Sequence, residues 1–323
     1  MNTRPIRLAA ALLSGLLLSA PAGAQEFPTK PVRIVVPFGA GSGLDIVMRF
    51  VADRMAKEWS QPVIVENRPG ATGVIGTEQV YRAPADGYTL LATTQSLYTG
   101  ASLVSKLAYD PVKDFTPVAR ISSANLAMVV ATSSPIASIQ SLVNEAKAKP
   151  TVLTYATLGA GSTAHLAGAL FNLVGGISVT AVHYKETSQA MADTMSGTVS
   201  MNFVAIPTAS AQIKVGRLKP VAVTGPSRSK ALPDVPTVAE AGVPGYEFVA
   251  WHGLFARAST PPALVRKIAE DVMKVGSIPE FSALLQAQGL DPNLKGPAEL
   301  AVQIPQEAQR LSKIMADAGV KRE

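Results

Sequence analysis

The chain has 323 residues, of which 47% are hydrophobic and 16% are charged; it has no cysteine and a formal net charge of +6. The lack of cysteine excludes disulfide scaffolds, thiolate metal sites and cysteine nucleophiles, and the length exceeds that of one typical domain. Basic residues are scattered and aromatic residues are few, a pattern that excludes the usual footprint of a nucleic-acid-binding protein. A weakly positive chain is compatible with an anionic ligand.

Residues 1–24 have the pattern of a secretory signal peptide. Two arginines provide the positive start, residues 8–18 form the apolar centre, and Ala22-Gly23-Ala24 provides a cleavage site of small residues. The apolar run is too short to span a bilayer comfortably. We therefore expect export to the periplasm, a mature chain that begins near Gln25, and no direct insertion into the membrane.

The first folded unit is predicted to be a strand, a loop with little side chain, and a helix. Residues 34–36 form a short apolar run typical of a buried strand, and Pro37 should end it because proline cannot donate to the ladder. Apolar residues then recur at helical spacing from Leu44 to Trp59. The bare loop leaves the N–H groups of the helix N-terminus free, with the positive end of the dipole behind them. An anion fits there without a basic side chain.

The loop sequence Gly-Ala-Gly-Ser at 39–42 is repeated at 159–162. The second copy again follows a strand-like run, 152–157, and precedes an apolar helix that starts at Ala164. Two such loops suggest two lobes that both offer donors to one ligand. The alternative is that four small residues recur by chance in ordinary turns, and the shared strand–loop–helix context favours a binding site.

Further polar candidates follow the third strand of the first lobe. We expect strands at 62–66 and 88–92, with a short helix at 74–82 between them. Four polar residues lie at the carboxyl end of strand 88–92, where ligands bind in open parallel sheets. They are Thr93, Thr94, Gln95 and Ser96. These residues are ligand contacts or, alternatively, helix caps and turn residues. Residues 110–120, which contain two prolines, are predicted to form a surface loop.

The rest of the chain alternates strands and helices. The expected strands are 126–131, 152–157, 177–184, 199–204, 220–224 and 248–256. The expected helices are 138–149, 164–173, 188–195, a short one that ends at 213–217, and 264–275, 278–288 and 298–318. Residues 225–245 are rich in proline and glycine and form a long connector. We expect the helical tail after this connector to pack on the first lobe.

This alternation predicts an α/β protein with two parallel-dominated sheets, each flanked by helices. The chain should cross between two lobes near 126–131 and return after 220–224. We therefore assign residues 25–124 plus 226–323 to lobe 1 and residues 125–225 to lobe 2. A ligand cleft between two such lobes predicts hinge closure on the ligand.

Two enzyme classes fit the sequence less well than a binding protein. A dinucleotide-binding loop needs a third glycine, where this chain has Leu44 or Ile46. Neither Ser42 nor Ser162 has a glycine two residues away on both sides, as a nucleophile elbow requires. No two histidines have the spacing of a helical zinc site, and no spacing selects a glycosidase-type carboxylate pair. We expect ligand binding without catalysis, cofactor or metal.

Five stretches carry a family resemblance. They are Phe27-Pro-Thr-Lys-Pro-Val-Arg-Ile-Val-Val-Pro-Phe38, Glu66-Asn-Arg-Pro-Gly70, Asp86-Gly-Tyr-Thr-Leu90, Pro233-Asp-Val-Pro-Thr-Val-Ala-Glu-Ala-Gly242 and Trp251-His-Gly-Leu-Phe255. Together they resemble the Bordetella uptake gene family, the extracytoplasmic solute-binding receptors of tripartite tricarboxylate transporters. The resemblance implies a two-lobed receptor with the fold of periplasmic binding proteins. It also implies a small carboxylate ligand that backbone amides and ordered waters hold, membrane transporter subunits as partners, and a monomeric receptor.

The resemblance places the ligand at the two Gly-Ala-Gly-Ser loops. The first-loop candidates are Phe38, Gly39, Ala40, Gly41, Ser42 and Asp45, the second-lobe candidates are Gly159, Gly161, Ser162, Thr163 and His165, and Thr93, Ser96 and Tyr184 complete the set. Ser42, Glu186, Ser200 and Ala205 stand where the family commonly has Gly, Gly, Asp, and Asp or Asn. This weaker polarity of the second lobe makes a less polar or aromatic acid an alternative to a plain di- or tricarboxylate.

Several individual roles have two interpretations. Asp45 compensates the dipole in the first helical turn and is interpreted as an organiser of the loop more than a ligand contact. His165 and Tyr184 either contact the ligand or pack, whereas the strand position of His183 favours a structural role. His252 either lines the cleft or packs. The alternative function is a ligand-sensing subunit for a membrane kinase, which needs the same receptor.

Overall fold

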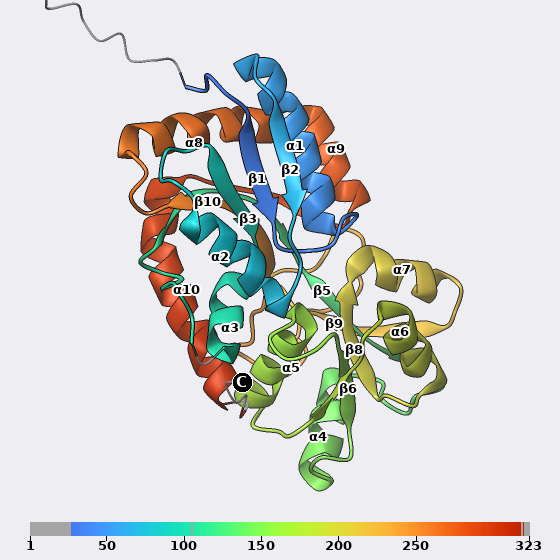
Figure 1. Cartoon of the computed structure of the whole chain (residues 1–323). Coiled ribbons are helices and arrows are strands. Elements are labelled where there is room, and N and C mark those ends of the chain that lie inside the picture. Colours follow the sequence, from blue (N-terminus) through green and yellow to red (C-terminus); the bar gives the residue numbers. More distant parts are fainter. Residues whose placement is uncertain (1–26, 105, 318, 320–323) are drawn as a thin grey trace, which may run out of the picture.

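The computed structural model describes residues 27–104, 106–317 and 319, which form two β-sheets flanked by helices (Figure 1). The signal peptide predicted at 1–24 lies outside the described residues. Within this part of the chain, no helix is both long enough and apolar enough to cross a membrane.

The first sheet, as far as the structure describes it, has the strand order β11–β4–β10–β3–β1–β2. The bounds are β1 Val32–Val36, β2 Val63–Asn67, β3 Thr89–Thr93, β4 Phe115–Ala124, β10 Ala250–Arg257 and β11 Asp291–Lys295. β1 pairs in parallel with β2 and β3, whereas β10, β4 and β11 join through antiparallel pairs. Residues 34–36 are fully buried, as the apolar run predicts.

The second sheet has the order β7–β6–β8–β5–β9 within the described residues. Its strands are β5 Leu126–Ala131, β6 Thr154–Thr157, β7 Thr180–His183, β8 Met201–Ala205 and β9 Leu218–Val223. β6 pairs in parallel with β7 and β8, so the loops after these three strands emerge at the same edge of the sheet. β5 pairs antiparallel with β8 and β9.

Helices cover both faces of the sheets. Their bounds are α1 Gly43–Trp59, η1 Ala71–Gly73, α2 Val74–Arg82, α3 Ser96–Leu103, α4 Ile139–Ala148, α5 Thr163–Gly175, α6 Thr187–Ser196, α7 Ile206–Lys214, α8 Pro262–Gly276, α9 Pro279–Ala287 and α10 Pro297–Asp317. Apolar residues of α1, α8 and α9 pack on one face of the first sheet. Residues of α3 and α10 pack on the other face, in a cluster that continues into α4, α5 and the second sheet.

The α/β fold class is confirmed, but the sheets are mixed rather than dominated by parallel pairs. The parallel pairs belong to the strand–helix–strand units, whereas β4, β5, β9 and β10, which lead into and out of the crossings, pair antiparallel. The surface loop predicted at 110–120 was wrong from Phe115 onward, because β4 starts there and lies between β10 and β11. Sequence reasoning also missed α3 and β11.

Thr224 links three chain segments near the point where the chain passes between the sheets. The Leu126 amide donates to the Thr224 Oγ1 (2.9 Å), the Thr224 amide donates to the Leu126 carbonyl (2.9 Å), and the Phe248 amide donates to the Thr224 carbonyl (2.8 Å). Part of the connector packs with the second sheet, since Val223 bridges to Thr237. The lobe boundaries predicted from the sequence stay a prediction.

The C-terminal helix α10 lies against elements of both sheets. Leu311 and Met315 of α10 share a core cluster with Leu97 of α3 and with Leu166 and Leu170 of α5. We expected the C-terminal tail to pack on the first lobe, and this describes only part of its packing. The buried apolar face of α10 also covers α5 (Figure 1).

Candidate functional site

The first Gly-Ala-Gly-Ser loop holds its own shape through hydrogen bonds. Gly41 has φ +80°, a left-handed conformation that glycine adopts without strain. The Ser42 Oγ accepts a hydrogen bond from the Asp45 amide (3.3 Å) and caps α1. The Asp45 Oδ2 accepts a hydrogen bond from the Gly41 amide (2.8 Å). These two bonds fold the loop onto the first turn of the helix.

The protein itself occupies both carboxylate oxygens of Asp45. Arg49 Nε donates to Oδ2 (3.0 Å) and Asn67 Nδ2 donates to Oδ1 (2.8 Å), and the Asp45 side chain is 2% exposed. Burial acts to raise the pKa of Asp45, but hydrogen bonds from Arg49, the Gly41 amide and Asn67 outweigh it and lower the pKa below its usual value. The charge of Asp45 is thus paired within the loop.

The second loop repeats this geometry with a different acceptor. Gly161 has φ +72°, and the Ser162 Oγ caps α5 by accepting from the His165 amide (3.4 Å). The Gly161 amide donates to His165 Nδ1 (3.1 Å), at the place where the Gly41 amide meets a carboxylate. Each loop therefore closes on the side chain four residues after its second glycine.

His165 fills this place as a neutral imidazole. Its Nδ1 must be unprotonated in order to accept the Gly161 N–H. Burial, together with the nearby His183, lowers the pKa of His165 to about 4. The His165 ring stacks on Tyr155 and meets His183 edge-on at 5.5 Å between ring centroids. The N-terminus of α5 thus has no carboxylate in its first turn.

Four backbone N–H groups at the two helix starts donate no hydrogen bond within the described part of the chain. They belong to Gly43 and Leu44 of α1 and to Thr163 and Ala164 of α5. Gly43 is exposed, and Thr163 and Ala164 are partly exposed. Free amides at the positive end of a helix dipole form a site for an anion.

The first turn of α3 lies between the two loops. The Ser96 Oγ is 3.3 Å from the position that a Cβ atom would take on Gly73, and that position is 3.5 Å from Pro37 at the start of the first loop. On the other side, the Thr99 Oγ1 donates to the Gly161 carbonyl of the second loop (3.2 Å). The structure therefore brings Ser96 close to one loop and joins its helix to the other.

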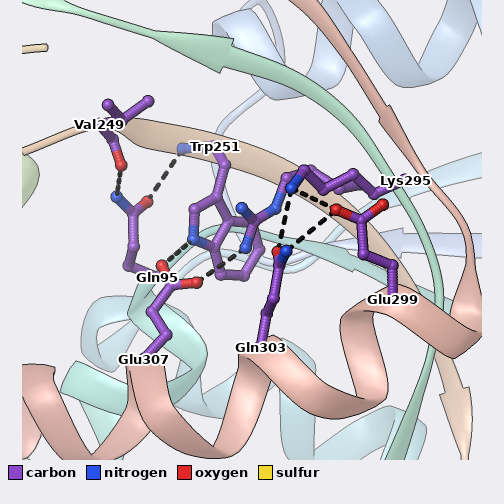
Figure 2. A network of polar contacts seen from close by, with 8 residues as sticks. Gln95, Val249, Trp251, Lys295, Glu299, Gln303 and Glu307 are labelled. Carbon is purple, nitrogen blue, oxygen red and sulfur yellow. Dashed lines mark hydrogen bonds and ion pairs between the residues drawn. The ribbon is translucent and has the colours of Figure 1, made fainter. Parts of the chain in front are cut away.

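The remaining strand-end candidates are engaged by the protein. Thr93 is fully buried, with its Oγ1 3.4 Å from the Ser96 Oγ. Gln95 reaches the chain segment that enters β10: its Nε2 donates to the Val249 carbonyl (2.9 Å) and its Oε1 accepts from the Trp251 amide (3.3 Å). Figure 2 shows this clamp and also Glu307 of α10, which accepts a hydrogen bond from the indole Nε1 of Trp251. Gln95 thus ties the end of β3 to a crossing segment.

Two second-lobe residues have partners away from the second loop. Tyr184 donates its hydroxyl hydrogen bond to Asp193 of α6 (2.9 Å), and burial and this carboxylate raise the pKa of Tyr184 to about 12. Ser200 exchanges hydrogen bonds with Thr154 between β8 and β6. Ala205, in contrast, is exposed at the carboxyl end of β8.

Sequence reasoning missed two features around the first loop and left the role of His252 open. Asn67 connects the loop to β2, because its Nδ2 also donates to the Phe38 carbonyl (3.1 Å). The turn 70–73 has four consecutive positive φ values, at 133°, 46°, 51° and 95°, and such strain concentrates at ligand sites. His252 lies beside Gly43. Gly70 and Gly73, which bracket the turn, were a signal for it in the sequence. The spacing of residues along the chain gave no signal for the partners of Asn67 and His252.

Two of the cavities lie outside the loops. One of about 550 Å³ is bounded mainly by α3, residues 104–112 and α10. The other, of about 370 Å³, lies between α5 and β7; His165 lines it, together with Tyr155 and Asn172, but none of residues 159–162 does. Among the described residues, no cluster of His, Asp and Glu is suited to holding a metal ion. The free amides therefore remain the features of this region that suit an anionic ligand.

Known proteins resemble this chain over most of its length. A family model described as tripartite tricarboxylate transporter family receptor matches residues 47–320. Protein BugT of Bordetella pertussis is 32% identical over 310 residues, which cover 94% of each chain. The structure of R. palustris Rpa4515 with adipate has a TM-score of 0.79 and 32% identity, covering 92% of this chain and 100% of that one. MatC (Rpa3494) from Rhodopseudomonas palustris with bound malate has a TM-score of 0.75 and 30% identity, covering 89% and 99%.

Proposed function

This chain belongs to the tripartite tricarboxylate transporter receptor family, a family of solute-binding proteins, and from that premise we propose that it captures a small organic acid between its two lobes. The carboxylate groups bind to the amides at the starts of α1 and α5. The receptor then delivers the acid to the membrane subunits of a tripartite transporter. A di- or tricarboxylate or an aromatic acid has the required charge and size.

The observation that carries this proposal is the matched pair of loops with free amides. Hydrogen-bond donors are available at both helix starts without a basic side chain. They are the backbone amides of Gly43 and Leu44 in α1, which packs on the first sheet, and of Thr163 and Ala164 in α5, which packs on the second. A hydrogen bond to a charged group contributes about 1.5–3 kcal/mol, and micromolar binding requires about 8 kcal/mol. Four such bonds reach this total before the costs of ordering are subtracted.

The relatives support an acid with two carboxylates. The solved relatives of R. palustris carry adipate in one case and malate in the other. Two loops on two sheets suit a ligand with a charge at each end. The exposed Ala205 leaves the second lobe less polar, which favours an acid with an apolar centre.

The proposal includes export and closure of the lobes. Residues 1–24 act as a signal peptide, and the mature receptor works in the periplasm as a monomer. Residues 25–124 plus 226–323 move as one lobe and residues 125–225 as the other, with the three segments around Thr224 as the hinge.

Isothermal titration calorimetry on residues 25–323 tests the proposed ligand class. The panel contains adipate, malate, citrate and benzoate, with adipamide as an uncharged match to adipate. We expect binding to one or more of the acids and none to adipamide. A panel of acids that all fail to bind, or equal affinity for adipate and adipamide, would contradict the proposed site.

A proline at the first position of each helix tests the free amides directly. Ser42 and Ser162 have extended conformations, with ψ of 156° and 159°, which suit the residue before a proline. Proline is also favoured at the first helical position. Gly43→Pro and Thr163→Pro therefore each remove one N–H with little effect on the fold. We expect each to weaken binding of the responding acid about 10- to 150-fold, the equivalent of one charged hydrogen bond.

Gly43→Ala and Thr163→Ala are the matched controls, because they change the side chain and keep the N–H. We expect both alanine variants to bind the acid with an affinity within about threefold of wild type, because they keep the N–H donor that the proline variants lack. Proline variants that bind as well as their alanine partners would remove these amides from the site.

A further inference from the structure

His252 projects from β10 at the place where the chain has just crossed from the second sheet. Its neighbours in register are Ser122 of β4, directly opposite, and Thr93 of β3, opposite the next residue, Gly253. The side chain is partly exposed. His252 thus lies where the chain enters the first sheet, and the sequence left open whether it lines the cleft or packs.

Ser122 selects the tautomer of His252. The Ser122 Oγ is 3.0 Å from His252 Nδ1, and Ser122 is completely buried. Among the residues that the structure describes, the Ser122 hydroxyl has no other hydrogen-bond partner. A buried hydroxyl donates its proton where an acceptor is available, so Ser122 donates to Nδ1. The proton of the neutral ring is then on Nε2.

The Cε1 edge of the His252 ring, which joins Nδ1 and Nε2, lies beside the first turn of α1. The His252 Cε1, the ring atom bonded to Nε2, is 3.9 Å from the position that a Cβ atom would take on Gly43. Burial lowers the pKa of His252 to about 4, so the ring is a neutral donor near pH 7. Within the described chain, the Nε2–H meets no acceptor that forms a hydrogen bond. A donor therefore stands next to the free Gly43 amide.

The geometry points to His252 as a ligand-contacting residue whose Nε2–H donates to an ionised carboxylate held at the N-terminus of α1. The inference rests on the function proposed above and adds a side-chain donor to a site otherwise made of backbone amides. One carboxylate oxygen accepts from the Gly43 amide and the other from the imidazole. Hydrogen bonds to an ionised acceptor are about twice as strong as neutral ones, so the contact contributes to affinity as well as to orientation.

Calorimetry with adipate and with malate compares two replacements of His252. His252→Gln keeps an N–H donor, whereas His252→Leu fills similar space without one. We expect adipate or malate to bind His252→Leu at least about tenfold more weakly than wild type and His252→Gln within about threefold. Thermal unfolding of both variants without ligand checks that they fold.

Nitrogen-15 NMR of the side chains gives a readout that packing alone would not change. The chain has three histidines, so substitution assigns each ring. In the unliganded receptor we expect His252 to show the Nε2–H tautomer, and in Ser122→Ala a mixture of both tautomers. Saturation with the bound acid should shift the His252 Nε2 resonance, and Ser122→Ala should bind more weakly than wild type but more tightly than His252→Leu.

The outcomes separate this inference from the proposed function. Binding of adipate or malate that is equal in wild type, His252→Gln and His252→Leu, with no shift at His252 Nε2, overturns the role of His252 and leaves the proposed function intact. An Nδ1–H tautomer in the unliganded protein also overturns it. If none of adipate, malate, citrate and benzoate binds wild type at millimolar concentration, the proposed function fails and this inference fails with it.

Discussion

Asp45 and His165 occupy the same place in two copies of one loop, and their chemistry differs. Both accept the N–H of a glycine in the left-handed region and both lie in the first turn of a helix. Asp45 needs Arg49 and Asn67 to satisfy its charge, whereas His165 needs no counter-ion because it is neutral. A shared backbone geometry therefore accepts either residue type, provided that the side chain offers one acceptor at the right distance.

The two histidines with lowered pKa predict how stability depends on pH. Folded His165 and His252 titrate at about 4, against about 6.5 in an unfolded chain. Between these values the unfolded state binds more protons, so the free energy of unfolding falls as the pH falls. Each histidine contributes a slope of up to about 1.4 kcal/mol per pH unit in this window.

Urea unfolding from pH 7 to pH 4.5 measures that slope. We expect His165→Gln and His252→Gln each to reduce it by about one proton, and the double variant by about two. The lower limit of pH 4.5 keeps the measurement above the range of Asp45, whose pKa is lowered. A slope that is the same in wild type and all three variants would contradict the burial of neutral histidines.

At the scale of one element, α5 depends on a glycine that contacts the strand beneath it. A Cβ atom on Gly168 would lie 2.2 Å from the ring of Tyr155, which is 2% exposed in β6. The close approach of α5 to β6 helps set the height of the second loop above the sheet. Gly175, in the last turn of the same helix, has no atom closer than 3.4 Å to its Cβ position.

Gly168→Ala and Gly175→Ala form a matched pair for this contact. We expect Gly168→Ala to lower the free energy of unfolding by about 1–3 kcal/mol because of overpacking, despite a gain in helix propensity of up to about 1 kcal/mol. Gly175→Ala should be neutral or slightly stabilising. Chemical denaturation measures both, and equal stability of the two variants would show that Tyr155 moves aside freely.

At the scale of the whole molecule, two contacts between the parts attached to the two sheets lie far apart in the chain. Thr99 of α3 donates to the Gly161 carbonyl (3.2 Å) at one place. At the other, a Cβ atom on Gly289, between α9 and β11, would lie 2.0 Å from Pro207 of α7. Any side chain at Gly289 therefore pushes α7 away from the first sheet, and we expect this to disfavour the proposed closure of the lobes.

Gly289→Ala should weaken ligand binding from a distance. Gly216→Ala is its control, because Gly216 has a similar φ (+71° against +67°) and no atom within 4 Å of its Cβ position. Both variants bear the same backbone strain, and only Gly289→Ala creates the clash. If the closed state becomes ten times rarer, the apparent dissociation constant for adipate or malate rises about tenfold.

Calorimetry and small-angle X-ray scattering check this prediction. We expect a larger radius of gyration for Gly289→Ala with ligand than for Gly216→Ala, and recovery of affinity when Pro207→Ala is added to Gly289→Ala. Identical affinities in the two glycine variants would show that the contact with Pro207 does not limit closure.

The local units of this protein can be recognised in short stretches of its sequence. Apolar runs, glycine loops and helical spacing predicted both strand–loop–helix units, and α2 and β5 begin and end at the expected residues. The hydrogen bonds that shape each loop join residues three or four positions apart, as in Gly41 to Asp45 and Gly161 to His165. Such bonds are encoded by neighbours in the chain, so a sequence pattern can reveal them.

Only the tertiary structure decided which distant segments meet. Gln95 and Val249 are 154 positions apart and Ser122 and His252 are 130 apart, and no periodicity links either pair. The same holds for β4 and β11, which pair antiparallel at one edge of the first sheet, and for α10, which packs on α5 as well as on the first sheet. Burial of whole faces selects these partners among many compatible surfaces, and that selection depends on how all the elements pack together.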